Sequence, residues 1–463
     1  MNNKYCIREF FLWKEKNKKI DLNNNLNDNI NMKKNIYCDI CDISILKSSY
    51  NKHSNSNKHK KLQKNNKIKF IDLFCGIGGF HQAFNSINKN KFECVFASDK
   101  DKKCIENYHL NYNILPNGDI KKVNIDHIPD FDILCGGFPC QAFSNAGNKQ
   151  TFNDDRGLLF DEIVKIAKVK KPKFMFLENV KHILKVDEGK VLEYIEKKIK
   201  ELGYYLQKQQ ISPHEYGVPQ QRERVYFICV RNDIYNKNNT KIKIESKTKD
   251  EIDNIQYDLT QYLDKEYEDK YKISGDILKC LNAWDEMIKK FDLNEKISPT
   301  IMINEHYNNH TQEDFNKYAQ WRKEYITKNK PLIKKYQNDF DVWYDKNKDI
   351  LSKCEVYGKL EWQVGPIKEN DSIFNYFIQI RQSGIRVKKN KYFPTLVAIN
   401  QTPIYGKEKR YITPRECARL QSFPEDFKID PDDKQSYKQF GNCVNVNNVK
   451  TVIETTLKHF NYL

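Results

Sequence analysis

Residues 70–79 read Phe-Ile-Asp-Leu-Phe-Cys-Gly-Ile-Gly-Gly, an apolar run that leads directly into a glycine-rich loop. The apolar residues predict a buried strand, and the residues after Gly79 predict a helix. Glycines at such a junction allow a tight strand-to-helix turn and let a ligand lie against bare backbone. The stretch therefore predicts a ligand-binding loop in an α/β sheet, and by itself it leaves dinucleotide binding open.

Downstream of this loop, short apolar runs alternate with helical patterns as far as Arg231. Apolar runs bounded by Gly, Pro or charge predict the strands of a parallel sheet covered on both faces. We therefore predict a doubly wound, Rossmann-like α/β fold over residues 67–232. The predicted strands are residues 70–74, 92–97, 131–135, 174–177 and 225–230, and helical spacing is clearest in residues 158–167 and 191–199.

The composition excludes several classes of protein. With 463 residues, 39% of them hydrophobic, the chain can bury at least one large core, and 17 Gly with 14 Pro exclude a collagen-like fibre. We find no run of 18 apolar residues and no signal-peptide pattern, so we expect an intracellular protein of the cytoplasm or nucleus with no membrane partner. The odd count of 13 Cys predicts reduced thiols.

Positive charge is concentrated near the start of the chain. The net charge is +17, and residues 1–69 carry 16 Lys and Arg against 6 Asp and Glu. Such an excess favours a polyanionic partner, although a solvated basic arm would have the same composition.

Two Cys and two His in this basic region have nearly the spacing of a zinc finger. Cys38 and Cys41 enclose two residues, eleven residues separate Cys41 from His53, and five separate His53 from His59. Two thiolates and two imidazoles can close a tetrahedral shell around Zn²⁺. We predict a structural Cys2His2 finger at about residues 36–62, within a basic region of residues 1–66. Accidental clustering is the alternative, and binding to nucleic acid or to protein stays open.

Two carboxylates follow strand positions near the glycine-rich loop. Asp99 ends the second predicted strand, where its side chain can accept hydrogen bonds from both hydroxyls of a ribose. Asp119 follows a predicted third strand and could meet an adenine amino group. Together they favour an adenosyl ligand over a bare phosphate.

The ends of later strands carry reactive side chains. Cys140 follows the predicted fourth strand, whose own Cys135 we place in the core, and it lies where such sheets bind ligands. A nucleophilic cysteine works as its thiolate and needs a partner that handles its proton. Glu178 ends the next apolar run and is a candidate for that role. Strand alternation predicts that Arg222 and Arg224 share a face near the same crevice, as surface residues or as phosphate clamps.

Six blocks of sequence resemble, in order and spacing, the motifs of the DNA (cytosine-5)-methyltransferase family. The resemblance extends from about residue 69 to the end of the chain. The blocks are residues 74–79 (FCGIGG), 137–141 (GFPCQ), 178–180 (ENV), 220–224 (QQRER), 413–420 (TPRECARL) and 439–444 (QFGNCV).

The resemblance implies an activity and its residues. The enzyme would transfer a methyl group from S-adenosylmethionine (SAM) to carbon 5 of cytosine in DNA, with the base turned out of the helix. Cys140 would attack carbon 6, Glu178 would bind N3, and Arg224, with Arg222, would support the O2 edge. The implied SAM pocket is Phe74, Gly76, Ile77, Gly78, Gly79, Asp99, Asp119, Ile120, Pro139, Leu159, Asn442 and Val444. Lys100 and Cys443 depart from the residues usual in the family.

The segment after Arg231 occupies the place of the family's target-recognition domain. We predict this domain over residues 233–410, with residues 411–463 returning to the catalytic domain. Candidate DNA contacts are the basic residues Arg381, Arg386, Lys388 and Lys389, with a solvated basic loop as the alternative. The implied partner is double-stranded DNA, the enzyme is expected to be monomeric, and a cognate restriction endonuclease stays open.

Two alternative functions use the same sequence features. A tRNA cytosine-5 methyltransferase would share the catalytic blocks, but the Cys-Phe-Thr tripeptide usual in that branch is absent. A catalytically inactive nucleic-acid-binding protein would not need every catalytic position intact. A hydride-transferring enzyme is excluded more firmly, because the glycines do not form Gly-x-Gly-x-x-Gly.

Overall fold

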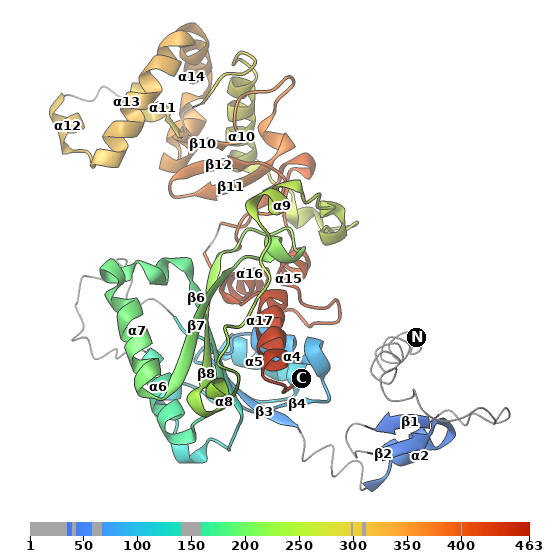
Figure 1. The fold of residues 1–463 in the computed structure, drawn as a ribbon. Helices are drawn as coiled ribbons and strands as arrows, with labels where there is room; N and C mark the ends of the chain where they lie inside the picture. Colours follow the sequence, from blue (N-terminus) through green and yellow to red (C-terminus); the bar gives the residue numbers. More distant parts are fainter. Residues whose placement is uncertain are drawn as a thin grey trace. The chain divides into compact units, whose positions relative to one another are not determined.

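The protein is described by a computed structural model that covers residues 35–38, 43–57, 67–139, 159–297, 300–307, 312–399 and 401–463. These residues belong to two units, one within residues 1–67 and one over residues 68–463 (Figure 1). In these ranges, no helix has both the length and the apolar character required to cross a membrane.

The first unit contains a small hairpin followed by a helix. Strand β1 (Asn35–Cys38) pairs antiparallel with β2 (Ile43–Leu46), and η1 (Lys47–Ser49) leads into α2 (Tyr50–Ser54). Two of the predicted zinc ligands are described: Cys38 is buried at the end of β1, and His53 lies on α2. Cys41 and His59 lie outside the described residues. No metal-binding cluster of three or more His, Cys, Asp or Glu occurs in the part of the chain that is described.

The second unit is built on a six-stranded sheet around the glycine-rich loop. Its strand order is β4-β3-β5-β6-β8-β7. The strands are β3 (Ile68–Leu73), β4 (Phe92–Ser98), β5 (Ile133–Gly137), β6 (Phe174–Val180), β7 (Tyr204–Ile211) and β8 (Arg224–Arg231). The first four of these are parallel, whereas β8 runs antiparallel to both β6 and β7.

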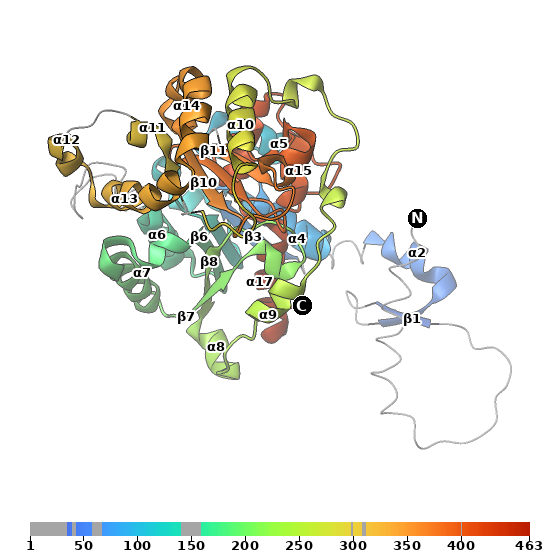
Figure 2. The same cartoon turned by 90° about the horizontal axis from the view of Figure 1, so that it is seen from above.

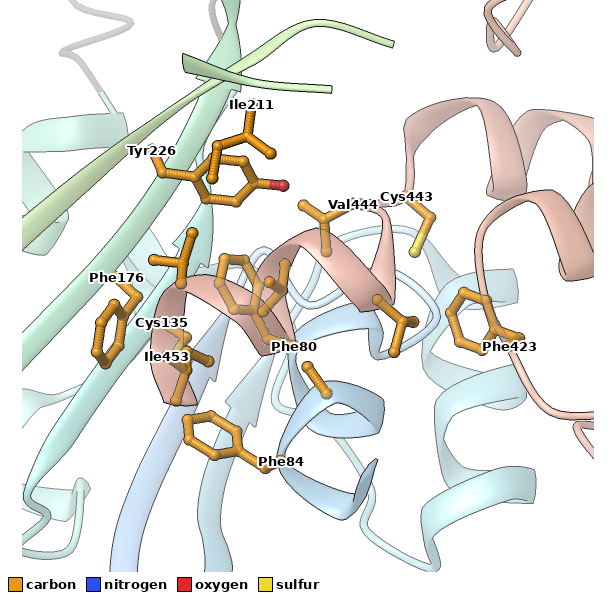
Figure 3. Close-up of a cluster of buried hydrophobic side chains, with 14 of the residues drawn as sticks. Phe80, Phe84, Cys135, Phe176, Ile211, Tyr226, Phe423, Cys443, Val444 and Ile453 are labelled. Atoms are coloured by element: carbon orange, nitrogen blue, oxygen red, sulfur yellow. The ribbon is translucent and has the colours of Figure 1, made fainter. Parts of the chain in front are cut away.

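Helices cover both faces of this sheet because its apolar residues alternate in direction along each strand. On one face Phe70, Cys135 and Phe176 pack with α4 and α17, as Figure 3 shows for Cys135, Phe176, Phe80, Phe84 and Ile453. On the other face Ile71, Leu134 and Met175 pack with α6 and α7. The helices are α4 (Gly79–Asn88), α5 (Lys102–Tyr112), α6 (Leu159–Lys170), α7 (Lys190–Glu201), α8 (Asn232–Asn238) and α17 (Val446–His459).

Three expectations about this sheet need correction. The sheet is mixed rather than parallel, because the 12 residues between β7 and β8 allow an antiparallel return but no crossover helix. The sequence analysis missed β7 itself. No strand precedes Asp119: residues 113–118, which include Pro116 and Gly118, form only an isolated bridge between Ser98 and Asn117. Strand β5, which leads toward Cys140, is therefore the third strand of this sheet in chain order and not the predicted fourth.

The region after α8 contains a second six-stranded sheet with its own core. Its order is β14-β13-β11-β12-β10-β9, and Figure 1 labels β10, β11 and β12 of this sheet. Its core packs around Trp284, Trp343 and Trp362. The strands are β9 (Ile301–Met302), β10 (Lys359–Gln363), β11 (Phe377–Arg381), β12 (Gly384–Lys388), β13 (Ile404–Tyr405) and β14 (Arg410–Tyr411). Both sheets belong to the same compact unit, so the proposed boundaries at residues 233 and 410 stay predictions.

Helices α10 and α14 pack against each other beside this sheet, with α13 alongside (Figure 2). The α-helices of this region are α9 (Lys249–Asn254), α10 (Gly275–Ile288), α11 (Ile303–Tyr307), α12 (Gln312–Lys317), α13 (Gln320–Lys335) and α14 (Gln337–Ser352). The chain then forms α15 (Pro414–Leu420) and α16 (Asp433–Asn442) before α17 packs against α4.

Candidate active site

The glycine-rich loop turns the chain sharply between β3 and α4. Gly78 has φ +84°, and a side chain there would collide with the Tyr112 ring, because an added Cβ would lie 2.2 Å from a ring carbon. The Tyr112 hydroxyl donates to the Gly78 carbonyl at 3.0 Å. Gly76 has φ +53° and nothing within 4 Å of an added Cβ. The loop is therefore supported from behind at Gly78 and open at Gly76.

The C-terminal motif closes the other side of the same loop. An added Cβ on Gly79 would lie 2.6 Å from Val444 and 2.8 Å from Cys443. Figure 3 shows both side chains beside the start of α4. Val444 thus lies against the predicted SAM loop although 364 residues separate it from Gly79. Asn442 is exposed at the end of α16.

The two predicted ligand carboxylates lie at the same edge of the sheet. Asp99 accepts hydrogen bonds from the backbone N–H groups of Gly76 at 2.9 Å and Asp101 at 2.8 Å. Burial raises the pKa of the Asp99 carboxyl, and these hydrogen bonds oppose the increase. The Ser98 hydroxyl donates to the Gly118 carbonyl at 2.7 Å, which ties the Asp119 loop to the end of β4. Asp119 caps the short helix η2 (Ile120–Lys122).

Glu178 and Arg224 meet because β8 is reversed. Since β6 and β8 are antiparallel, the start of β8 lies beside the end of β6, and Arg224 pairs with Val180. Arg224 Nε lies 2.9 Å from Glu178 Oε1, and both side chains are almost completely buried. Burial raises the pKa of Glu178, whereas the charge of Arg224 acts in the opposite direction. The result is a desolvated acid held in one orientation.

The Glu178 carboxyl also faces the strand that leads to the predicted nucleophile. Gly137 pairs with Glu178 across β5 and β6, and an added Cβ on Gly137 would lie 3.5 Å from Glu178 Oε2. Phe138 and Pro139 are the last described residues of this segment, and Pro139 is exposed. Cys140 lies outside the described residues, as does the rest of the loop up to residue 158. Leu159, the next described residue, begins α6.

Asn179 is a positioning residue that the sequence analysis did not assign. Its side-chain amide donates to the Phe138 carbonyl at 2.9 Å, two residues before Cys140, and its side chain is buried. Its side-chain oxygen accepts from the Val180 N–H. The only sequence signal was its place beside Glu178 in the 178–180 block.

Arg222 does not share a strand face with Arg224, because β8 begins at Arg224. Its buried guanidinium donates to the carbonyl oxygens of Leu396 at 2.7 Å, Gly441 at 3.0 Å and Cys443 at 2.8 Å. Burial lowers the pKa of Arg222 to about 9, and the charge of Arg224 contributes. These contacts show Arg222 bracing the C-terminal segment, while its catalytic assignment stays a prediction.

The predicted DNA-contact residues lie on and beside β11 and β12. Arg386 is paired with Glu361 of β10 at 2.5 Å. Lys388 donates to the side chain of Gln221 and lies over the Tyr392 ring. Arg381 ends β11, and Lys389 is exposed after β12.

Comparisons with known proteins identify the family of this chain and a similar fold. The family model for C-5 cytosine-specific DNA methylases matches residues 68–458. The Type II methyltransferase M.HhaI of Haemophilus parahaemolyticus is 31% identical over 380 residues, covering 82% of this chain and 91% of that protein. M.BanI of Aneurinibacillus aneurinilyticus is 32% identical over 421 residues, covering 84% and 95%. The fold is similar to that of a Spodoptera frugiperda DNMT2 mutant, with a TM-score of 0.50, 19% identity, and coverage of 84% of this chain and 99% of that one.

Proposed function

This chain belongs to the C-5 cytosine-specific DNA methylase family, and we propose that it works through a covalent adduct between Cys140 and the target base. It transfers a methyl group from SAM to carbon 5 of cytosine in DNA. The observation that carries the residue assignment is the buried Glu178–Arg224 pair beside the strand that leads to Cys140.

The covalent step activates a carbon that is otherwise a poor nucleophile. The Cys140 thiolate bonds to carbon 6, and the electrons of the 5,6 double bond move onto carbon 5 and the ring. Glu178 gives a proton to N3, and Arg224 binds O2, so the added negative charge is neutralised. After methylation of carbon 5, a base removes the carbon 5 proton, the carbon–sulfur bond breaks, and the double bond returns with Cys140 as the leaving thiolate. N3 gives its proton back to Glu178.

The residues around the glycine-rich loop fit an adenosyl ligand. Gly76 leaves open space beside its backbone, and Asp99 is held rigid by two backbone N–H groups while each oxygen keeps a lone pair for a ribose hydroxyl. Bound SAM supplies an electrophilic methyl group on a sulfonium. The residues that would hold it are Phe74, Gly76, Ile77, Gly78, Gly79, Asp99, Asp119, Ile120, Pro139, Leu159, Asn442 and Val444.

The target base must leave the helix to reach these groups, because its ring atoms are inaccessible in a stacked duplex. We infer a monomeric enzyme that acts on double-stranded DNA inside the cell. The relatives are named Type II methyltransferases, which supports a role in restriction and modification beside a nuclease of the same specificity.

An oligonucleotide that contains 5-fluorocytosine tests the covalent mechanism. Fluorine cannot leave as a proton does, so the enzyme and SAM should form a complex that survives denaturing electrophoresis. Cys140→Ala should still bind SAM but should neither methylate DNA nor form this complex. Methylation by the Cys140→Ala protein would contradict the assignment.

We also propose that Cys38, Cys41, His53 and His59 bind a structural Zn²⁺. The β1–β2 hairpin followed by α2 supports this, because it places Cys38 and His53 on the two kinds of element that a Cys2His2 finger uses. The purified chain should contain one zinc ion per molecule, and Cys38→Ser should lose it.

Removing residues 1–66 separates the function of this module from catalysis. The compact unit over residues 68–463 should keep its turnover on short DNA. Loss of the basic module should weaken DNA binding and reduce its dependence on salt. Unchanged DNA affinity would exclude a DNA-binding role for the module.

A further inference from the structure

The central strands of the second sheet have two chemically different faces. Register places Gln379 of β11, Arg386 of β12 and Glu361 of β10 side by side in one row. The next residue of each strand points the other way, and Ile380, Val387 and Trp362 belong to or pack against the hydrophobic core. The face that carries Arg386 therefore bears mostly polar side chains, with Phe377 of β11 as an apolar exception that packs into the first core, and Gln379 and Glu361 on it are buried. We call it the polar face.

The polar face carries more positive than negative charge. Its cations are Lys359, Arg381, Arg386 and Lys388, and its one carboxylate is Glu361. Arg386 is paired with Glu361, and Lys359 is paired with Glu355 outside the face. Arg381 and Lys388 form no ion pair within the described part of the chain. Two cations are thus left without a counter-ion.

These two cations are also partly withdrawn from water. Burial, together with the charges of Arg386 and Arg381, lowers the pKa of Lys388 to about 8. Burial and the charge of Arg386 lower the pKa of Arg381, and the charge of Glu361 opposes this decrease. Arg381 Nε is buried and has no hydrogen-bond partner in the described structure. A desolvated donor without a partner is unfavourable, so this face is prepared for a ligand rich in acceptors.

The polar face adjoins the segment that carries the catalytic arginine. Lys388 bonds to the Gln221 side chain, and Gln220 forms a bridge with Phe393. Gln221 lies three residues before Arg224, whose guanidinium contacts Glu178. Figure 1 shows β10, β12 and β11 on the side of the second sheet region that faces the rest of the unit. DNA with its target base at Glu178 would place its flanking base pairs near this face.

We propose that Arg381 reads a guanine in the recognised DNA sequence, through hydrogen bonds to O6 and N7 in the major groove. This rests on the proposed function. Gln379, whose amide donates to the Gln401 carbonyl, and the Arg386–Glu361 ion pair are already engaged and fix the surroundings of Arg381. The Arg381 guanidinium is left as the two-pronged donor that matches O6 and N7 of guanine. A phosphate contact would suit an exposed, mobile cation such as Lys389. Arg386 holds its position through Glu361 and is a positioning residue for this face.

The test measures methylation rates on a library of duplexes randomised around one cytosine. The wild-type enzyme should show a preference for guanine at one position. Arg381→Lys keeps the charge but loses the two-pronged donor, so this preference should weaken about 10- to 100-fold at that position. Preferences at the other positions should remain. Lys389→Ala is the matched control and should lower rates on all sequences alike.

Arg381→Ala should give the same loss of preference, and its thermal unfolding and SAM affinity establish that the variant is folded. If Arg381→Lys keeps the wild-type preference, or if Arg381→Ala slows all sequences equally, the guanine contact is wrong. The second of these outcomes would assign Arg381 to phosphate. A wild-type enzyme that methylates no duplex would instead contradict the proposed function, so the two failures are distinguishable.

Discussion

The two sheets of this protein treat buried charge in opposite ways. At the end of the catalytic sheet, the charged groups are matched: Arg224 neutralises Glu178, and three carbonyl oxygens surround Arg222. On the polar face of the second sheet, Arg381 and Lys388 lack a carboxylate partner among the described residues. Internal partners hold the catalytic groups in the geometry of one reaction, whereas cations without a carboxylate partner can bind an external acceptor. The comparison indicates that catalytic charges are paired within the protein, whereas charges that bind DNA are left for a partner outside it.

Changing Glu178 should give the largest effect on activity. Glu178→Gln removes the proton donor to N3 while nearly keeping its shape, so the methylation rate should fall about 10²- to 10⁴-fold. Single-turnover kinetics on a short duplex measures this. Glu223→Gln is the control, because Glu223 is half-exposed and forms an ion pair with Lys181 on the surface. A similar loss in both variants would contradict the role of Glu178.

Arg222 should matter more for stability than for chemistry. Arg222→Ala leaves three buried carbonyl oxygens without their donor, which should lower the free energy of unfolding by about 3 kcal/mol or more. Denaturant unfolding measures this difference. Arg231→Ala removes a surface guanidinium paired with Asp233 and should cost less than about 1 kcal/mol. If Arg222→Ala unfolds like the wild type but is inactive, its role is catalytic rather than structural.

Changing a glycine of the glycine-rich loop should have a smaller effect on stability and on SAM binding, and Gly217 provides a matched control. Gly78 and Gly217 both have positive φ, but only Gly78 would press a new Cβ into a neighbour, Tyr112. Gly217→Ala should therefore cost about 1 kcal/mol through backbone strain alone. Gly78→Ala should cost more and also raise the Kd for SAM about 10-fold, measured by calorimetry, since a shift of about 1.4 kcal/mol is tenfold. Equal effects of both variants would show that the Tyr112 contact is unimportant.

The smallest expected effect is a dependence of DNA binding on pH. Because the pKa of Lys388 is lowered to about 8, this side chain is charged at pH 7 and largely neutral at pH 9. Affinity for duplex DNA should therefore fall a few-fold over this interval. Fluorescence anisotropy measures DNA affinity against pH for the wild type and for Lys388→Met. The difference between the two slopes isolates the contribution of Lys388 from that of other titrating residues. Identical slopes would remove Lys388 from the DNA contacts.

Local patterns predicted much of the catalytic sheet. The apolar runs at β3, β4, β6 and β8 each contain enough consecutive buried residues to indicate a strand without knowledge of its neighbours. Strand β7 was missed because four consecutive polar residues, Gln207 to Gln210, interrupt its apolar run, and its pairing with β8 decides its structure. The strand predicted before Asp119 is absent. The segment there contains Pro and Gly and lies beside the end of β4 through a single bridge, which is too little pairing to form a strand.

Sequence alone determined the family, the chemistry and the glycine-rich loop, because these depend on residue types at short spacing. Tertiary structure decided which side chains meet. Val444 contacts the Gly79 position, Asn179 donates to Phe138, and Arg222 donates to the C-terminal segment. Each contact joins segments that are far apart in the chain. The polar face arises in the same way, since cross-strand register rather than sequence spacing brings its charges together.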